Sequence, residues 1–253
     1  WNITIPAGGS LSDLYASDRV PVLPTAYKNT VKLTFYNLGT KIRFGFYETI
    51  PGYSVQINKF YYNGDGSTTN FGVDGKFETL NKTADSHLTI TYYDDNTTIE
   101  NRPKVTIPSG GSTQTAYGEF GTNIQPTEKI GTASNAATYD QANGEYTDIL
   151  PCQIADNTLN LKVDYTLTST DGSEEQIHVY GATAVVPANF TQWKENFAYP
   201  YLFKISDNTN GSTDPSDPTN PDKKGLYPIT FDAEVVETTD GLAEYITTVS
   251  QAS

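Results

Sequence analysis

The 253-residue sequence contains no methionine, a single cysteine and only two histidines. Because Met is missing even from position 1, we expect that a signal peptide, and more of the N-terminus with it, has been removed ahead of Trp1. Cys152 has no cysteine partner within the chain and is interpreted as a small buried hydrophobic residue beside Pro151, with a reactive thiol as the alternative. No apolar run approaches the ~20 residues that a membrane-spanning helix needs, so we expect no such segment.

Positive charge is also scarce. Lys and Arg number 16 against 30 Asp and Glu, which gives a formal net charge of −14 at pH 7. This charge repels the phosphates of nucleic acids and of anionic lipids, so neither is an expected partner. Tyrosine, by contrast, occurs 18 times. Tyr and Thr favour the half-buried surfaces of β-sheets, and the many Gly and Pro residues suit frequent turns.

Apolar and polar residues alternate in many short segments bounded by turn signals. Such alternation predicts strands with one buried face. The segments cover residues 1–5, 30–36, 41–48, 53–62, 88–93, 159–168, 176–186, 193–205 and 226–237. No long amphipathic helix is expected. The fold class predicted from this pattern is all-β, an antiparallel sandwich or barrel with long polar loops.

Two of these segments carry specific predictions about the core. In the first, Val31, Leu33 and Phe35 alternate with polar residues and are predicted to face the core. The second is 193–205, the richest in large side chains, which a polar loop separates from 226–237. We interpret these two as a core strand pair whose inward residues are Tyr201, Phe203 and Ile205 on one side and Tyr227, Ile229, Phe231, Ala233 and Val235 on the other.

No spacing typical of a catalytic site is present. His87 and His178 are interpreted as exposed or hydrogen-bonded structural residues, because a metal site would need them to converge with a carboxylate. No flanking motif supports Cys152 and a histidine as a nucleophile–base pair. Among thirty acidic residues, carboxylate pairs of the glycosidase type are expected by chance. The sequence therefore assigns no catalytic, metal-binding or cofactor-binding residue, and no cofactor.

Two ligand sites stay open as alternatives. Asp214, Asp217 and Asp222 place oxygen donors in one loop at spacings of three and five, and calcium prefers oxygen ligands, although a solvated loop is the simpler interpretation. Exposed tyrosines either form a face that stacks on sugars or fill strand positions. These are Tyr15, Tyr61, Tyr62, Tyr92, Tyr93, Tyr117 and Tyr180.

Three stretches occur in a characteristic order. The first is Asp13-Leu-Tyr-Ala16 followed by residues 31–44, with the pattern V-x-L-x-F and then K-I-x-F. The second is residues 161–167 with Asp171-Gly172, and the third is 193–205 with 226–232. Together they resemble the fimbrillin-like family of Bacteroidetes surface proteins. The matching residues span most of 13–237 and are packing residues rather than catalytic ones.

The resemblance implies a β-sandwich of transthyretin-like type, export as a lipoprotein, and assembly into surface fimbriae by β-strand addition between subunits. The family's lipidated cysteine and N-terminal domain have no recognisable counterpart here, and Val20-Pro21 after Arg19 differs from the family's processing site. We therefore expect 1–24 to be an N-terminal remnant or linker, 25–237 the β-sandwich domain, and 238–253 a C-terminal tail.

The leading hypothesis from the sequence is a non-catalytic structural or adhesive subunit of fimbriae at the cell surface, associated with the outer membrane. Its expected partners are other fimbrial subunits, through strand exchange, and ligands on host or bacterial surfaces. The alternative is a cell-surface carbohydrate-binding β-sandwich module, motivated by the tyrosine count. A hydrolase that uses two facing carboxylates is a third hypothesis.

Overall fold

The computed structural model describes residues 1–11, 13–26, 29–62, 78–79, 84–96, 98–106, 114–115, 147–151, 159–216, 230–237 and 245–249. These residues are all-β, as predicted, with two single-turn 3-10 helices, η1 (Pro24–Ala26) and η3 (Ala188–Phe190). None of the described helices is long and apolar enough to cross a membrane.

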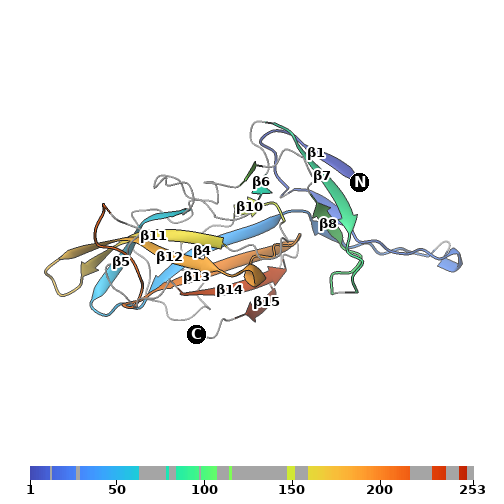
Figure 1. Ribbon diagram of the computed structural model, residues 1–253. Coiled ribbons are helices and arrows are strands. Elements are labelled where there is room, and N and C mark those ends of the chain that lie inside the picture. The colour runs from blue at the N-terminus through green and yellow to red at the C-terminus, as the bar shows by residue number, and fades with distance from the viewer. Residues whose placement is uncertain are drawn as a thin grey trace.

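The strands form three larger sheets and two small ribbons (Figure 1). The five-stranded sheet has the order β10 (Thr147–Ile149), β4 (Thr40–Glu48), β13 (Phe197–Ile205), β14 (Thr230–Glu237), β15 (Tyr245–Val249). One three-stranded sheet has the order β12 (Gln176–Val186), β11 (Leu159–Ser169), β5 (Tyr53–Tyr62). The other has the order β1 (Asn2–Ile5), β7 (Ser86–Tyr92), β8 (Pro103–Thr106). The ribbons pair β2 (Tyr15–Ser17) with β3 (Phe35–Asn37), and β6 (Glu78–Thr79) with β9 (Gln114–Thr115).

The five-stranded sheet and the β12-β11-β5 sheet share one hydrophobic core. Its strand residues come from β4 and β13 on one side and from β5, β11 and β12 on the other, and Phe190 and Trp193, which precede β13, complete it. Phe203 lies at its centre with no exposed surface, stacked on Phe44 and Phe46 at ring-centroid distances of 6.2 Å and 5.2 Å. Two sheets that close over one core form a sandwich, as predicted. The transthyretin-like type stays a prediction.

One strand pair runs in a direction that the alternation did not indicate. β13 lies parallel to β4, with Tyr201 opposite Phe44 and Phe203 opposite Phe46, whereas the other ladders between described strands are antiparallel. Alternation defines which face of a strand is buried but not the direction of its neighbour. A parallel neighbour needs a long crossover, and the chain from Thr49 to Asn196 supplies it.

The segment 193–205 is a core element, as predicted. Tyr201, Phe203 and Ile205 are each at most 1% exposed, and β13 pairs antiparallel with β14 so that Phe203 lies opposite Phe231. Ala198 and Leu202, on the other face of β13, are buried as well, so both faces of this strand are covered. Tyr227, Ile229 and the side chains of the remaining predicted β14 core residues lie outside what the structure describes.

A second, smaller core lies beside the first. Ile5 of β1, Leu88 and Ile90 of β7 and Val105 of β8 pack in it with residues from the chain that leads to β4, among them Leu38. The β1-β7-β8 sheet therefore has its own apolar face. The smaller core makes this sheet a distinct layer at one end of the sandwich (Figure 1).

The prediction that Val31, Leu33 and Phe35 face the core is wrong. Their side chains are 43%, 47% and 58% exposed. Only Phe35–Asn37 of this segment is a strand, and it pairs with β2, the other half of its own hairpin. The alternation is that of a strand with one apolar face. A face is buried only when another element covers it, and no described element covers this one.

Candidate functional site

The segment that leads into β13 joins the sandwich to the chain between β3 and β4. The Asn37 amide donates to Oδ1 of Asn196 at 3.0 Å, and the Asn196 amide donates to the carbonyl of Gly39 at 3.0 Å. The Thr40 hydroxyl donates to the carbonyl of Lys194 at 2.7 Å. Asn196 has φ of 66°, a left-handed conformation that Asn tolerates better than most residues. This local geometry turns the side chain of Glu195 toward the smaller sheet.

Glu195 is a buried carboxylate between the two cores. Its side-chain oxygens accept hydrogen bonds from the amide of Val105 in β8 and, at 2.9 Å, from the hydroxyl of Tyr93. Burial raises the pKa of this carboxyl above its ordinary value. Hydrogen bonds from its own backbone, from Val105 and from Tyr93, and the nearby charge of Lys104, oppose that shift. Because its partners all belong to the smaller sheet and its flank, Glu195 acts as a polar link between the sandwich and that sheet.

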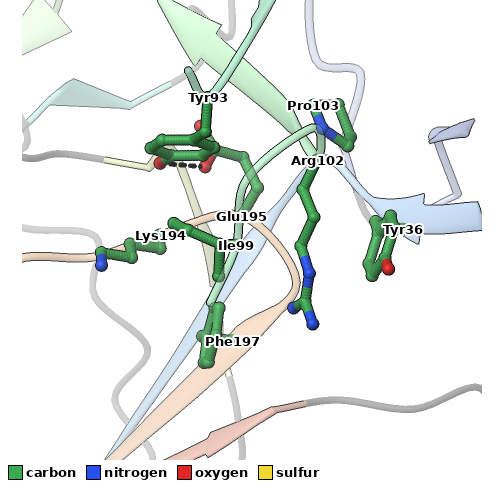
Figure 2. Close-up of a pocket in the computed structure, with 8 residues that line it drawn as sticks. All are labelled: Tyr36, Tyr93, Ile99, Arg102, Pro103, Lys194, Glu195 and Phe197. Carbon is green, nitrogen blue, oxygen red and sulfur yellow. Dashed lines mark hydrogen bonds between the residues drawn. The ribbon is translucent and has the colours of Figure 1, made fainter. Parts of the chain in front are cut away.

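The residues around this link line a small pocket (Figure 2). The Arg102 guanidinium lies 4.6 Å from the ring centroid of Tyr36, and the Lys104 ammonium lies 5.1 Å from that of Tyr93, as in cation–π contacts. The space open to the centre of a water molecule is ≈ 10 Å³, enough for about one water. A sugar or cofactor does not fit, so we interpret the pocket as part of the joint. Its lining also includes Ile99, Pro103, Lys194 and Phe197.

Most of the exposed large apolar side chains among the described residues lie on one hairpin. We call residues 18–34 the arm, which continues from β2 and β3. The Asp18 amide donates to the carbonyl of Thr34 at 2.9 Å, and the Thr34 amide donates to Oδ1 of Asp18 at 3.1 Å. Beyond these bonds the described residues of the arm, 18–26 and 29–34, project away from all the sheets (Figure 1). It exposes the side chains of Val20, Val22, Leu23, Val31 and Leu33.

Arg19 holds the root of the arm against the smaller sheet. Its backbone amide donates to the carbonyl of Asn101 at 2.9 Å, and its guanidinium pairs with Asp94. The same guanidinium lies 5.1 Å from the ring centroid of Tyr92. The arm therefore leaves the body in a defined direction, and the charge of Arg19 is already paired within the chain.

The structure places the two histidines in different sheets. Nδ1 of His87 in β7 is 3.2 Å from the hydroxyl of Thr4, and Nδ1 of His178 in β12 is 2.9 Å from that of Thr166. Within the described residues, no group of three His, Cys, Asp or Glu side chains is placed to hold a metal ion. Cys152 lies outside the described residues. So does the greater part of the Asp214 loop, including Asp217 and Asp222.

The tyrosines proposed as a sugar-stacking face are only partly described. Tyr117 and the side chains of Tyr61 and Tyr62 lie outside the description. The other four do not share a face: Tyr15 is in β2, Tyr92 in β7 and Tyr180 in β12, while Tyr93 is buried.

Sequence reasoning missed both the buried Glu195 and the arm. The available signal for Glu195 was the polar tripeptide Lys194-Glu195-Asn196, which interrupts an otherwise aromatic stretch. For the arm, the signal was the prolines at 21 and 24, which limit strand pairing.

No family model and no curated protein matches this sequence. Among solved structures, the chain is similar to a fimbrial protein from Bacteroides vulgatus ATCC 8482, at 14% identity and a TM-score of 0.43, over 80% of this chain and 55% of that one. It is also similar to a proposed cell adhesion protein from Bacteroides eggerthii DSM 20697, at 12% identity and a TM-score of 0.30, over 85% of this chain and 58% of that one. This chain thus spans less than two thirds of either neighbour.

Proposed function

We propose that this protein is a non-catalytic structural or adhesive subunit of cell-surface fimbriae, exported and associated with the outer membrane. In this proposal subunits assemble by β-strand addition, and 25–237 is the assembling domain. The observation that carries it is the β12-β11-β5 sheet, which ends in edge strands of 11 and 10 residues.

A long edge strand is a template for another chain, because its outward backbone groups are available for a further ladder. The middle of β12 is occupied within the chain: Tyr180 and Ser212 exchange two backbone hydrogen bonds, and the Thr183 amide donates to Oδ1 of Asn210 at 2.9 Å. β5 has β11 on one side and no partner strand on the other among the strands that the structure describes. Its inward residues Val55 and Ile57 are fully buried, so its register is fixed. We therefore favour β5 as the accepting edge.

The test combines location with hydrogen exchange. Antibodies against the purified chain are expected to label filaments on the surface of the source cells in electron micrographs. Amides of β5 are expected to become protected when the chain assembles, while those of β11, the central strand, serve as an internal control that stays unchanged. A chain found only as a cytoplasmic monomer would refute the proposed function. Assembly without new protection at either sheet edge would refute strand addition alone.

A further inference from the structure

We propose that the arm docks onto the opposite end of the sandwich of a second copy of this chain, so that subunits associate head to tail. This inference rests on the proposed function, because it assigns a contact between assembling subunits. It differs from strand addition in that side chains of the arm, rather than an open sheet edge, make the contact.

The arm has the composition of an interface core and lacks a partner surface in the described structure. Val22 and Leu23, near its far end, are 58% and 65% exposed, more than any other Val, Leu or Ile side chain of the described residues. Contiguous apolar groups on a projecting element mark a site of protein association rather than ordinary surface. Such groups need a partner with an apolar centre and a polar rim.

The charge of the arm points to a second copy as that partner. The arm contains three basic residues, Arg19, Lys28 and Lys32, and one acidic residue, Asp18, so its formal net charge is 3 − 1 = +2. Arg19 is already paired with Asp94. The chain as a whole has a formal net charge of −14. A basic, apolar arm on an acidic protein is complementary to the body of another copy, and this complementarity favours correctly oriented encounters.

The acidic surface that best fits the arm lies at the other end of the sandwich. We call the β11–β12 turn, residues 169–176, and the adjoining turn at 49–52 the distal end; the Thr170 amide joins them by donating to the carbonyl of Gly52 at 2.9 Å. Asp171, Glu174 and Glu175 are exposed there, and no Lys or Arg occurs between residues 163 and 193.

The distal end also has the apolar centre that the arm requires. Ile50, Leu167 and Ile177 are partly buried against the end of the main core, so each keeps some exposed surface. Leu167 and Ile177 are neighbours across the β11–β12 ladder. The acidic residues of the turn adjoin these apolar side chains in the chain, as polar rim residues adjoin an apolar interface centre.

The positions of the two surfaces determine the kind of assembly. Figure 1 shows the arm and the β11–β12 turn at opposite ends of the long direction of the molecule. A contact between two different surfaces at opposite ends is heterologous, and repeated contacts of this kind give an open filament rather than a closed dimer. The arm therefore supplies a longitudinal contact, of the kind that a fimbria needs.

The test uses the whole chain and follows its self-association by sedimentation velocity over a range of concentrations. The arm variant Val22→Ser/Leu23→Ser and the distal-end variant Glu174→Lys/Glu175→Lys are each expected to weaken self-association at least about tenfold, the size of an interface hot spot. Each variant is expected to keep the melting temperature of the natural chain, since all four side chains are exposed. Val185→Ser, at a 38% exposed site in β12, is the matched control and is expected to leave association unchanged.

Mixing the two variants separates a head-to-tail contact from a symmetric one. The arm variant keeps a functional distal end and the distal-end variant keeps a functional arm, so the mixture is expected to form one-to-one complexes that grow no further. A mixture that stays monomeric, or arm variants that associate as well as the natural chain, would overturn the proposal. A monomeric natural chain that binds phosphatidylglycerol vesicles through Val22 and Leu23 would also overturn it, and would assign the arm to a lipid surface.

These outcomes are distinct from those that test the proposed function. Surface filaments whose growth does not depend on the arm would refute the arm contact and leave the fimbrial function standing. Arm-dependent chains of subunits, formed by a protein that is found only in the cytoplasm, would support the contact and refute the fimbrial function.

Discussion

Phe203→Ala tests the assignment of 193–205 to the centre of the sandwich. The Phe203 ring has no exposed surface and is stacked on Phe44 and Phe46 of the neighbouring strand. Truncation to Ala removes the buried ring and leaves a cavity, at an expected cost of about 3–5 kcal/mol in the free energy of unfolding. With a urea m-value of about 2–3 kcal/mol/M, the unfolding midpoint is expected to fall by about 1–2 M.

Phe35→Ala is the matched control, because it is the same substitution in a segment with the same alternating pattern. The Phe35 side chain is 58% exposed, so its loss is expected to change stability by no more than about 0.5 kcal/mol. Urea unfolding followed by circular dichroism measures both variants at one pH. The packing argument is refuted if Phe203→Ala leaves the midpoint unchanged, or if Phe35→Ala lowers it as much.

Three further predictions concern polar groups and backbone. The pKa of Glu195 lies above its ordinary 4.5, so the folded state holds a proton that the unfolded chain releases, and this group's contribution to stability falls as pH rises from 4.5 through the folded pKa. Glu195→Gln has no such titrating group and is expected not to lose this stability as pH rises. Urea titrations over this pH range measure the free energy of unfolding of both proteins, and a difference between them that stays constant with pH would contradict the prediction. Tyr201→Phe removes the hydroxyl that accepts a hydrogen bond from the Trp193 indole N–H and donates one to the Phe190 carbonyl. Loss of these two buried hydrogen bonds is expected to lower the free energy of unfolding by about 1–3 kcal/mol, measured by thermal unfolding. An unchanged melting temperature would contradict a stabilising role for these two bonds. Gly211 has φ of 150°, and a Cβ there would collide with Val179, whereas Gly52 has φ of 79° and open space around it. Gly211→Ala is therefore expected to lower the melting temperature more than Gly52→Ala does. Equal melting temperatures for the two variants would show that the collision is relieved.

The sequence correctly predicted the strands whose burial or pairing follows from their own residue pattern. Residues 159–168 and 176–186 alternate cleanly around a short turn, and they form the adjacent antiparallel strands β11 and β12. The stretch 193–205 has too many large side chains to remain exposed, and it is the middle strand of the larger sheet. In these cases local pattern and burial agree, because the number of apolar groups alone demands a core.

Residues 31–35 have the same pattern, but the opposite environment. Nothing within the segment distinguishes Val31 from Tyr201, because the difference lies in whether a second sheet faces the strand. The same limit applies to Glu195: a Glu beside aromatic residues gives no indication that Val105 and Tyr93, about a hundred positions earlier, supply its hydrogen bonds. Partners distant in the sequence are decided by the packing of whole sheets.

The sequence by itself determined that this protein is all-β and acidic, and that its densest aromatic stretch builds the core. Those properties follow from composition and from a period of two residues, which are local. Only the tertiary structure decided that β13 runs parallel to β4, that Glu195 links two cores, and that the apolar arm remains uncovered at one end with an acidic turn at the other. Each of these depends on which surfaces meet, and burial free energy is a property of the pair of surfaces rather than of either strand alone.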